Sequence, residues 1–175
     1  MNSSTTRSAR MKFIPAGILL AGGLWLVACN PQMAKGQIKG VVYHDMCAPP
    51  GPGGPTPSPE SGCVPLSGGG YRANGTLDVG EPGIPDVVVH LAVGACSSAV
   101  LQTTTTDVAG EYTFTGVTPG LHCVYVSVSE NANILIPGEW TDPLTSDDTA
   151  TKTVQLAPAE TKSAVYFGWD FQFAP

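Results

Sequence analysis

The sequence is poor in charge, and especially in positive charge. Only 13% of its 175 residues are charged, with 8 Lys and Arg against 14 Asp and Glu, which gives a net charge of −6. A nucleic-acid-binding domain needs a basic surface to neutralise phosphates. The composition therefore predicts no nucleic-acid partner.

Strong helix formers are also scarce, and no helical hydrophobic stripe follows the first 28 residues. Gly and Pro are abundant instead, at 21 and 16 residues, and Val and Thr are frequent. The hydrophobic fraction of 42% is sufficient for a folded core. The length is too short for two full-sized domains. These features favour one all-β domain.

The N-terminus has no apolar run long enough for an ordinary membrane span. Arg7, Arg10 and Lys12 precede sixteen uncharged residues, 13–28, whereas a span needs about 20. This order is typical of a signal peptide. The run ends in Leu26-Val27-Ala28-Cys29, which resembles the lipobox of bacterial lipoproteins.

The lipobox resemblance implies a division of the chain into three parts. Residues 1–28 are a lipoprotein signal peptide, with Met11 as an alternative start; 29–35 are a tether lipidated at Cys29; and 36–175 are the domain. The domain would be held on the extracytoplasmic side of a membrane, at the cell surface or on the periplasmic face. An ordinary cleaved signal with an incidental Cys29 is the alternative.

The other four cysteines contain no C-x-x-C pair, which disfavours a zinc site. An even number in an exported chain predicts two disulfides, for which three connectivities are possible. We favour Cys47–Cys63, which brackets a Pro/Gly-rich insertion at 47–70, and Cys96–Cys123, which links two predicted strands.

Alternating apolar residues predict about seven short strands. Val87, Val89, Leu91 and Val93 share one face, and Tyr112 and Phe114 follow a turn that indicates a hairpin with the strand before it. Irregular structure is expected at 131–149. The strands are expected at 38–43, 87–93, 100–106, 112–114, 121–128, 151–156 and 163–169.

Several of these segments together are similar to the SdrD B-like domain of bacterial surface proteins, a relative of Cna B-type and prealbumin-like sandwiches. They are 36–45, 74–87, 104–114, 117–120 and 165–169. The resemblance implies an immunoglobulin-like β-sandwich that acts as a non-catalytic stalk or adhesive module, often with bound calcium. The insertion at 47–70 is longer than the family's, and one copy stands alone.

An acidic loop offers the oxygen ligands that calcium prefers. Asn74, Asp78 and Glu81 have the spacing of the latter half of a calcium loop, and Thr76 offers its carbonyl. The family resemblance adds Asp45 from across the insertion. The first half of the loop signature is missing, so a solvated acidic turn is the alternative.

Other side chains give no pattern for catalysis. There is no G-x-S-x-G motif, and His44, His90 and His122 lie far apart, so surface or loop positions are expected for them. Some relatives form an isopeptide crosslink, for which Lys39, Asp170 and Glu111 are weak candidates here. Four aromatic residues could form a sugar-binding platform, although packing roles are favoured: Trp140, Tyr166, Trp169 and Phe171.

The sequence therefore predicts an exported lipoprotein with one β-sandwich and no enzymatic activity. Its role would be structural or adhesive, with calcium as the candidate cofactor. The membrane would be one partner, through Cys29, and a protein or glycan at the cell surface another. A carbohydrate-binding module of prealbumin-like fold is the alternative, and an accessory to a larger periplasmic enzyme is a weaker one.

Overall fold

The structure is a computed structural model that describes residues 33–47 and 62–171. The predicted signal peptide, the lipidation site Cys29 and most of the Pro/Gly-rich insertion lie outside the described residues. Among those described, no helix is long and apolar enough to cross a membrane.

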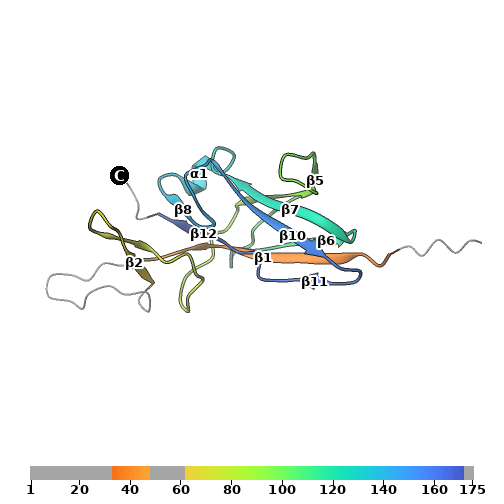
Figure 1. Cartoon of the computed structure of the whole chain (residues 1–175), viewed down its shortest axis with the longest axis horizontal. Helices are drawn as coiled ribbons and strands as arrows, with labels where there is room; N and C mark the ends of the chain where they lie inside the picture. The colour runs from red at the N-terminus through yellow and green to blue at the C-terminus, as the bar shows by residue number, and fades with distance from the viewer. Residues whose placement is uncertain (1–32, 48–61, 172–175) are drawn as a thin grey trace, which may run out of the picture. The chain divides into compact units, whose positions relative to one another are not determined.

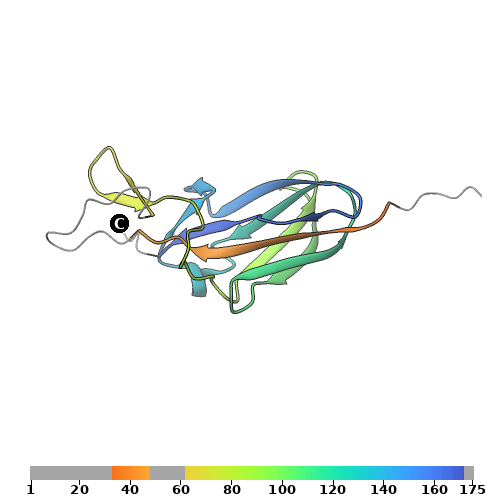
Figure 2. The same cartoon turned by 90° about the horizontal axis from the view of Figure 1, so that it is seen from below.

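The described chain folds into two sheets and a separate hairpin, which confirms the predicted β-sandwich (Figures 1 and 2). One sheet has the order β11(Thr161–Lys162), β1(Gly36–His44), β12(Phe167–Asp170), β8(Glu139–Asp142), β9(Leu144–Thr145), with β6(Glu111–Val117) also paired to β1. The other has the order β10(Thr149–Leu156), β7(Gly120–Ser127), β4(Val88–Val93), β5(Val100–Thr105). The hairpin is β2(Cys63–Pro65) with β3(Tyr71–Ala73).

Strand β1 is the centre of its sheet. It pairs antiparallel with β6 and, farther along, parallel with β12, where Val42 lies opposite Phe167. The first and last strands of the domain are therefore neighbours. This pairing brings residues just after β1 to the same end of the sandwich as β8 and the β2–β3 hairpin (Figure 1).

The core lies between the two sheets and is built from the alternating residues that the sequence indicated. Val89 and Leu91 of β4 and Val124 and Val126 of β7 are fully buried. Val93, predicted on the same face, is 51% exposed because the strand ends there. The opposite sheet contributes larger side chains: Ile38, Val42, Tyr112, Phe114, Trp140, Phe167 and Trp169.

The turn between β5 and β6 was predicted to close a hairpin, and this prediction is wrong. Strand β5 pairs with β4, whereas β6 pairs with β1, so the turn carries the chain from one sheet to the other. Asp107 organises it, since its Oδ1 accepts hydrogen bonds from the backbone N–H groups of Ala109 and Glu111. Gly110, at φ 73°, packs against Val42 O, where a Cβ would collide.

Two segments expected to be irregular contain regular structure. The segment 131–149 forms α1(Ala132–Leu135), β8 and β9, and Trp140 of β8 is 1% exposed. The described end of the 47–70 insertion contains β2, which pairs with β3 beyond it. Neither segment shows an alternating pattern long enough to predict a strand, because these strands have only two to four residues.

Candidate functional site: an acidic cluster at one end of the sandwich

Asp45 is the most deeply buried of the predicted calcium ligands. It follows β1, and its backbone N–H donates to Trp169 O at 3.0 Å, which fixes it beside β12. The residue is 0% exposed. Its Oδ2 accepts a hydrogen bond from the Gly75 N–H at 2.7 Å, whereas its Oδ1 has no hydrogen-bond partner among the described residues.

The loop at 74–81 wraps around its own polar side chains. Thr76 N–H donates to Asn74 Oδ1 at 2.7 Å, as in an Asx turn, and Asn74 Nδ2 donates to Asp78 Oδ2 at 2.9 Å. Glu81 closes the loop, because its two oxygens accept from the N–H groups of Asp78 and Met46, each at 2.8 Å. Glu81 thus ties the loop to the residue directly after Asp45.

Two carboxyl groups of this acidic cluster have raised pKa values. Burial raises the pKa of Asp45, hydrogen bonding by Thr141 and the Gly75 N–H opposes this rise, and the nearby charge of Asp170 adds to it. Burial likewise raises the pKa of Glu81, with added repulsion from Asp45 and Asp78. Both shifts have the cause expected for negative charge that is poorly solvated and poorly neutralised.

Two buried hydroxyl groups near this cluster make no well-aligned hydrogen bond to a described residue, although that of Thr141 lies close enough to Asp45 to lower the pKa of its carboxyl group. Tyr43 Oη and Thr141 Oγ1 are both buried beside Gly168. A Cβ added at Gly168 would lie 2.7 Å from Tyr43 Oη and 2.6 Å from Thr141 Oγ1. Burial, and then the charge of Asp45, raises the pKa of the Tyr43 hydroxyl, so it stays protonated at neutral pH. This end of the sandwich therefore contains both unpaired oxygens and excess negative charge.

The structure brings the five predicted calcium ligands into one region: Asp45, Asn74, Thr76, Asp78 and Glu81. They do not form a ready-made metal centre. No three His, Cys, Asp or Glu side chains in the described part of the chain are grouped as metal ligands. Glu81 is one reason, because both of its oxygens face backbone N–H groups. Tyr43 and Thr141 were not predicted, since nothing in their sequence spacing links them to the loop.

Both predicted disulfides are present. Cys47–Cys63 has a Cα–Cα distance of 4.9 Å and packs with Ala73 in a small cluster outside the main core. It lies two residues after Asp45 and so borders the acidic cluster. Cys96–Cys123 has a Cα–Cα distance of 5.0 Å. It links strand β7 to the loop that connects β4 and β5.

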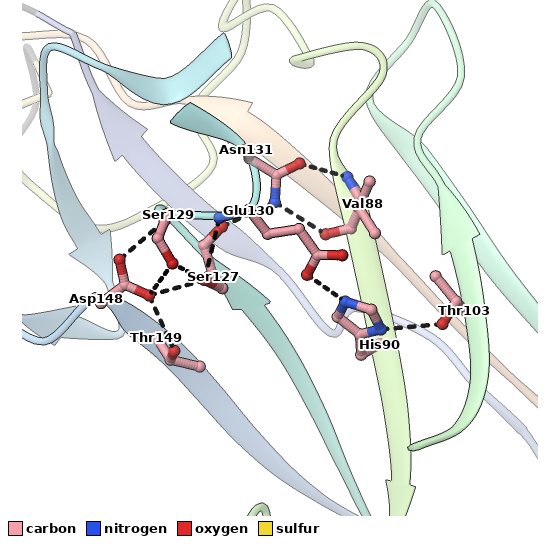
Figure 3. Close-up of polar contacts among 9 residues, drawn as sticks. All are labelled: Val88, His90, Thr103, Ser127, Ser129, Glu130, Asn131, Asp148 and Thr149. Atoms are coloured by element: carbon pink, nitrogen blue, oxygen red, sulfur yellow. Dashed lines mark hydrogen bonds and ion pairs between the residues drawn. The ribbon is translucent and has the colours of Figure 1, made fainter. Parts of the chain in front are cut away.

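The histidines are less exposed than predicted. His122 is 1% exposed, and its Nε2 lies 2.7 Å from Thr118 O. His90, on the outer face of β4, is 8% exposed because its ring stacks on that of Tyr125. Its two ring nitrogens contact Thr103 and Glu130 (Figure 3). These contacts tie β4 to β5 and to the segment after β7.

The other candidate constellations do not assemble. Trp140 and Trp169 pack edge to face inside the core, with their ring centroids 4.7 Å apart. They therefore cannot form an exposed aromatic row. Lys39 is exposed opposite Thr113, whereas Asp170 is buried beside Glu139 on β8. The three groups needed for an isopeptide bond are therefore not buried together.

Similarity to known proteins is found both in structure and at the level of a family. A crystal structure from Pseudomonas aeruginosa, described as a candidate carbohydrate-binding protein, aligns with a TM-score of 0.36 and 13% identity over 81% of this chain and 92% of its own. No curated protein sequence matches. The SdrD B-like domain matches residues 71–169, more than half of the chain. This match and the two disulfides point to a non-catalytic surface or binding module of an exported protein. The chain belongs to the SdrD B-like domain family.

Proposed function

We propose that this protein is a lipoprotein held at the cell envelope through Cys29, with its β-sandwich displayed as a structural or adhesive module stabilised by calcium. The basic segment, the apolar run and the Leu26–Cys29 sequence support the anchor. Family membership and the β-sandwich support the structural role.

The burial of Asp45 is the observation that carries the calcium proposal. A carboxylate that is 0% exposed and has one oxygen without a partner among the described residues is costly unless a cation neutralises it. Glu81 and Asp78 belong to the same cluster and add further negative charge. A divalent cation would neutralise two of these three negative charges.

The chemistry of the donors fits calcium. Carboxylate, amide and backbone carbonyl oxygens are the ligands that Ca²⁺ takes, six to eight at a time and in flexible geometry. Asp45, Asp78 and Glu81 would supply the charge, and Asn74 and the Thr76 carbonyl would supply neutral oxygens. Glu81 would have to give up at least one of its backbone hydrogen bonds. Ion binding is therefore expected to rearrange the loop as well as neutralise it.

Thermal unfolding of the full chain in millimolar calcium and in chelator tests this proposal. Binding to the folded state stabilises it by RT ln(1 + [L]/Kd), or ~2.7 kcal/mol at a hundredfold excess over Kd. For a domain of this size the melting temperature should rise by about 5–10 °C. Glu81→Ala should abolish most of the rise, and the exposed control Glu111→Ala should keep it.

Two outcomes would contradict the calcium proposal. No calcium-dependent shift in the wild type would make 74–81 an ordinary acidic turn. A shift that survives Glu81→Ala would place the ion elsewhere, with Asp142, Asp147 and Asp148 as the next candidates.

The lipid anchor has an independent test. Mass spectrometry of the membrane fraction should find Cys29 as an acylated N-terminal residue, and Cys29→Ser should release the protein from the membrane. An unmodified thiol at Cys29, or wild-type protein in the medium, would overturn the assignment. A pull-down from native envelopes, with and without calcium, would then identify the surface partner.

A further inference from the structure

Among the described residues, three of the strands that end a sheet are either very short or charged. Strands β11 and β9 lie at the two ends of one sheet and have two residues each. Strand β10 ends the other sheet and carries Lys152, whose Nζ donates to Asp142 Oδ1 at 2.7 Å. Short edge strands and Lys residues are common means of preventing a sheet from pairing with another chain.

Strand β6 is also an edge strand, because it pairs with β1 alone among the described strands. Its outward backbone groups are largely occupied. Glu111 N–H donates to Asp107 Oδ1, and Glu111 O accepts from the Asp107 N–H, each at 2.9 Å. Farther along, Gln102 Nε2 donates to Thr115 O at 3.1 Å. These contacts protect β6 from pairing with a further strand.

Strand β5 has no such protection on its open side. It pairs with β4 alone among the described strands, and its six residues include no charge, no Gly and no Pro. Thr106 N–H donates at 2.9 Å to the carbonyl of Val87, directly before β4. Because the backbone groups of successive residues point to opposite sides of a strand, those of Thr103 and Thr105 point away from β4. Both residues are exposed.

Four exposed apolar side chains gather where β4, β5 and β7 lie together at one end of their sheet: Val93, Val100, Leu101 and Leu121. Each is about half exposed. Val100 lies opposite Ala92, and the Gly94 N–H donates to Leu121 O at 2.7 Å. This apolar patch adjoins the open edge of β5, so a partner strand placed there would also cover apolar surface.

The same part of the sequence lacks charge. Residues 87–106 contain no Asp, Glu, Lys or Arg, whereas the whole chain has a net charge of −6. Two copies of an acidic protein repel each other, and this repulsion is weakest where neither copy carries charge at the contact. Glu130 reaches the outer face of the sheet at β4, where it lies against the His90 ring (Figure 3). Association of two copies is therefore least opposed along β5.

A second copy of the chain fits this edge. Antiparallel pairing about a two-fold axis near Thr103 would bring the same strand of the partner alongside, and the outward groups of Thr103 and Thr105 would gain ladder hydrogen bonds. Uncharged Thr side chains would then be neighbours across the contact. We propose that β5 mediates homodimerisation by joining the four-stranded sheets of two copies into one continuous sheet. This role goes beyond the proposed function and depends neither on calcium nor on the lipid anchor.

The contact between two single strands is small. A register shift leaves Leu101 without a partner in β4 and limits the regular part of β5 to residues 102–105. Interfaces that bury less than about 1,200 Å² are typically those of weak or transient complexes. The dimer is therefore expected to form as the protein concentration rises.

Cysteine crosslinking of the full chain in detergent provides the first test. Thr103→Cys, treated with a short bismaleimide, should yield a covalent dimer. Thr113→Cys is the matched control, since Thr113 is exposed on the protected edge strand β6, and it should remain monomeric. The wild type gives the background from its own cysteines. The same yield is expected in calcium and in chelator, so the outcome is independent of the calcium proposal.

Charge complementation provides the second test. Thr103→Lys and Thr103→Glu each place like charges close together across the two-fold axis, and each should weaken the dimer by about tenfold in sedimentation velocity. An equimolar mixture of the two variants should restore the dimer, because opposite charges then meet. Thr113→Lys should dimerise as the wild type does. Melting curves verify that each variant is folded.

Four results would overturn the inference. Equal crosslinking of Thr103→Cys and Thr113→Cys would show random collision. A wild type that stays monomeric at every concentration would leave the edge of β5 unpaired. A dimer that neither charged variant weakens, or that their mixture does not restore, would lie elsewhere on the molecule. In native envelopes, linkage of Thr103→Cys to a different protein without linkage to itself would replace the second copy by another partner.

Discussion

Strand β1 passes through an apolar interior and then ends in a polar one. In the middle of the sandwich, Ile38 and Val42 are 0% exposed and pack within a continuous hydrophobic core. Immediately afterwards, Tyr43 and Asp45 are equally buried but carry oxygens without partners among the described residues. Equal burial therefore has opposite energetic consequences within eight residues, because Ile38 and Val42 gain from leaving water whereas Tyr43 and Asp45 lose hydration.

We therefore expect the middle of the sandwich to provide most of the stability of the domain, and the stability of the acidic end to depend on solution conditions. The middle is built mainly from apolar side chains such as Ile38 and Val42, which carry no titratable group. The acidic end is expected to respond to pH, to cations and to the state of the Cys47–Cys63 bridge next to it. Substitutions in the two regions should therefore differ in sign as well as in size.

The largest effect is expected in the middle. Phe167 is 0% exposed and contacts the rings of Tyr112 and Trp140. Phe167→Ala should lower the free energy of unfolding by about 3–5 kcal/mol, equally in calcium and in chelator, because it leaves a cavity in the core. Denaturant titration measures this. A loss below 1 kcal/mol would show that the interior is not packed tightly around this ring.

Removal of each disulfide in turn also distinguishes the acidic end from the middle of the sandwich. The bridges close segments with sequence separations of 16 and 27 residues, so loop entropy predicts a similar loss of about 3 kcal/mol for each. The response to calcium should differ. The double variant Cys47→Ser/Cys63→Ser should weaken the calcium shift, because its bridge borders Asp45, whereas Cys96→Ser/Cys123→Ser should retain it. Equal calcium shifts in the two variants would argue against coupling between the bridge and the acidic end.

Asp45→Asn should have an effect whose sign depends on calcium. In chelator it removes a buried negative charge and should stabilise the domain by about 1–2 kcal/mol. In millimolar calcium it removes a ligand and should lower stability relative to the wild type. Melting curves in both conditions measure the crossover, with Glu111→Gln as the exposed control. Destabilisation of the same size in both conditions would mean that Asp45 is purely structural.

How much of this could be predicted from the sequence differs between the two regions. The middle follows from local patterns, since Val89, Leu91, Val124 and Val126 alternate and are buried as expected. Trp140 was harder to place, because its strand has four residues within a segment without regular alternation. The exchange of β5 and β6 between sheets was missed because a turn sequence does not specify which strands pair.

The acidic end was predictable only in part. The spacing of Asn74, Asp78 and Glu81 identified the loop, and the family resemblance added Asp45. Tyr43 and Thr141 join it only because β1, β12 and β8 are neighbours in the sheet, a tertiary arrangement that no local spacing encodes.

The smallest expected effect is the dependence of stability on pH that Asp45 and Glu81 contribute at the acidic end. The pKa values of Asp45 and Glu81 in the folded state are raised above their ordinary values of 3.8 and 4.5. At a pH between the ordinary and the folded-state pKa values, the folded state therefore binds more protons than the unfolded state. Stability in chelator should therefore fall as pH rises through the folded pKa values, and a pKa raised by one corresponds to about 1.4 kcal/mol. Melting temperatures between pH 5 and 7.5 should fall in chelator but not in calcium, because a bound ion keeps both carboxylates ionised. Asp45→Asn should flatten the slope and Phe167→Ala should preserve it; a slope that Asp45→Asn leaves unchanged would assign the titration to other groups, with Glu139 first among them.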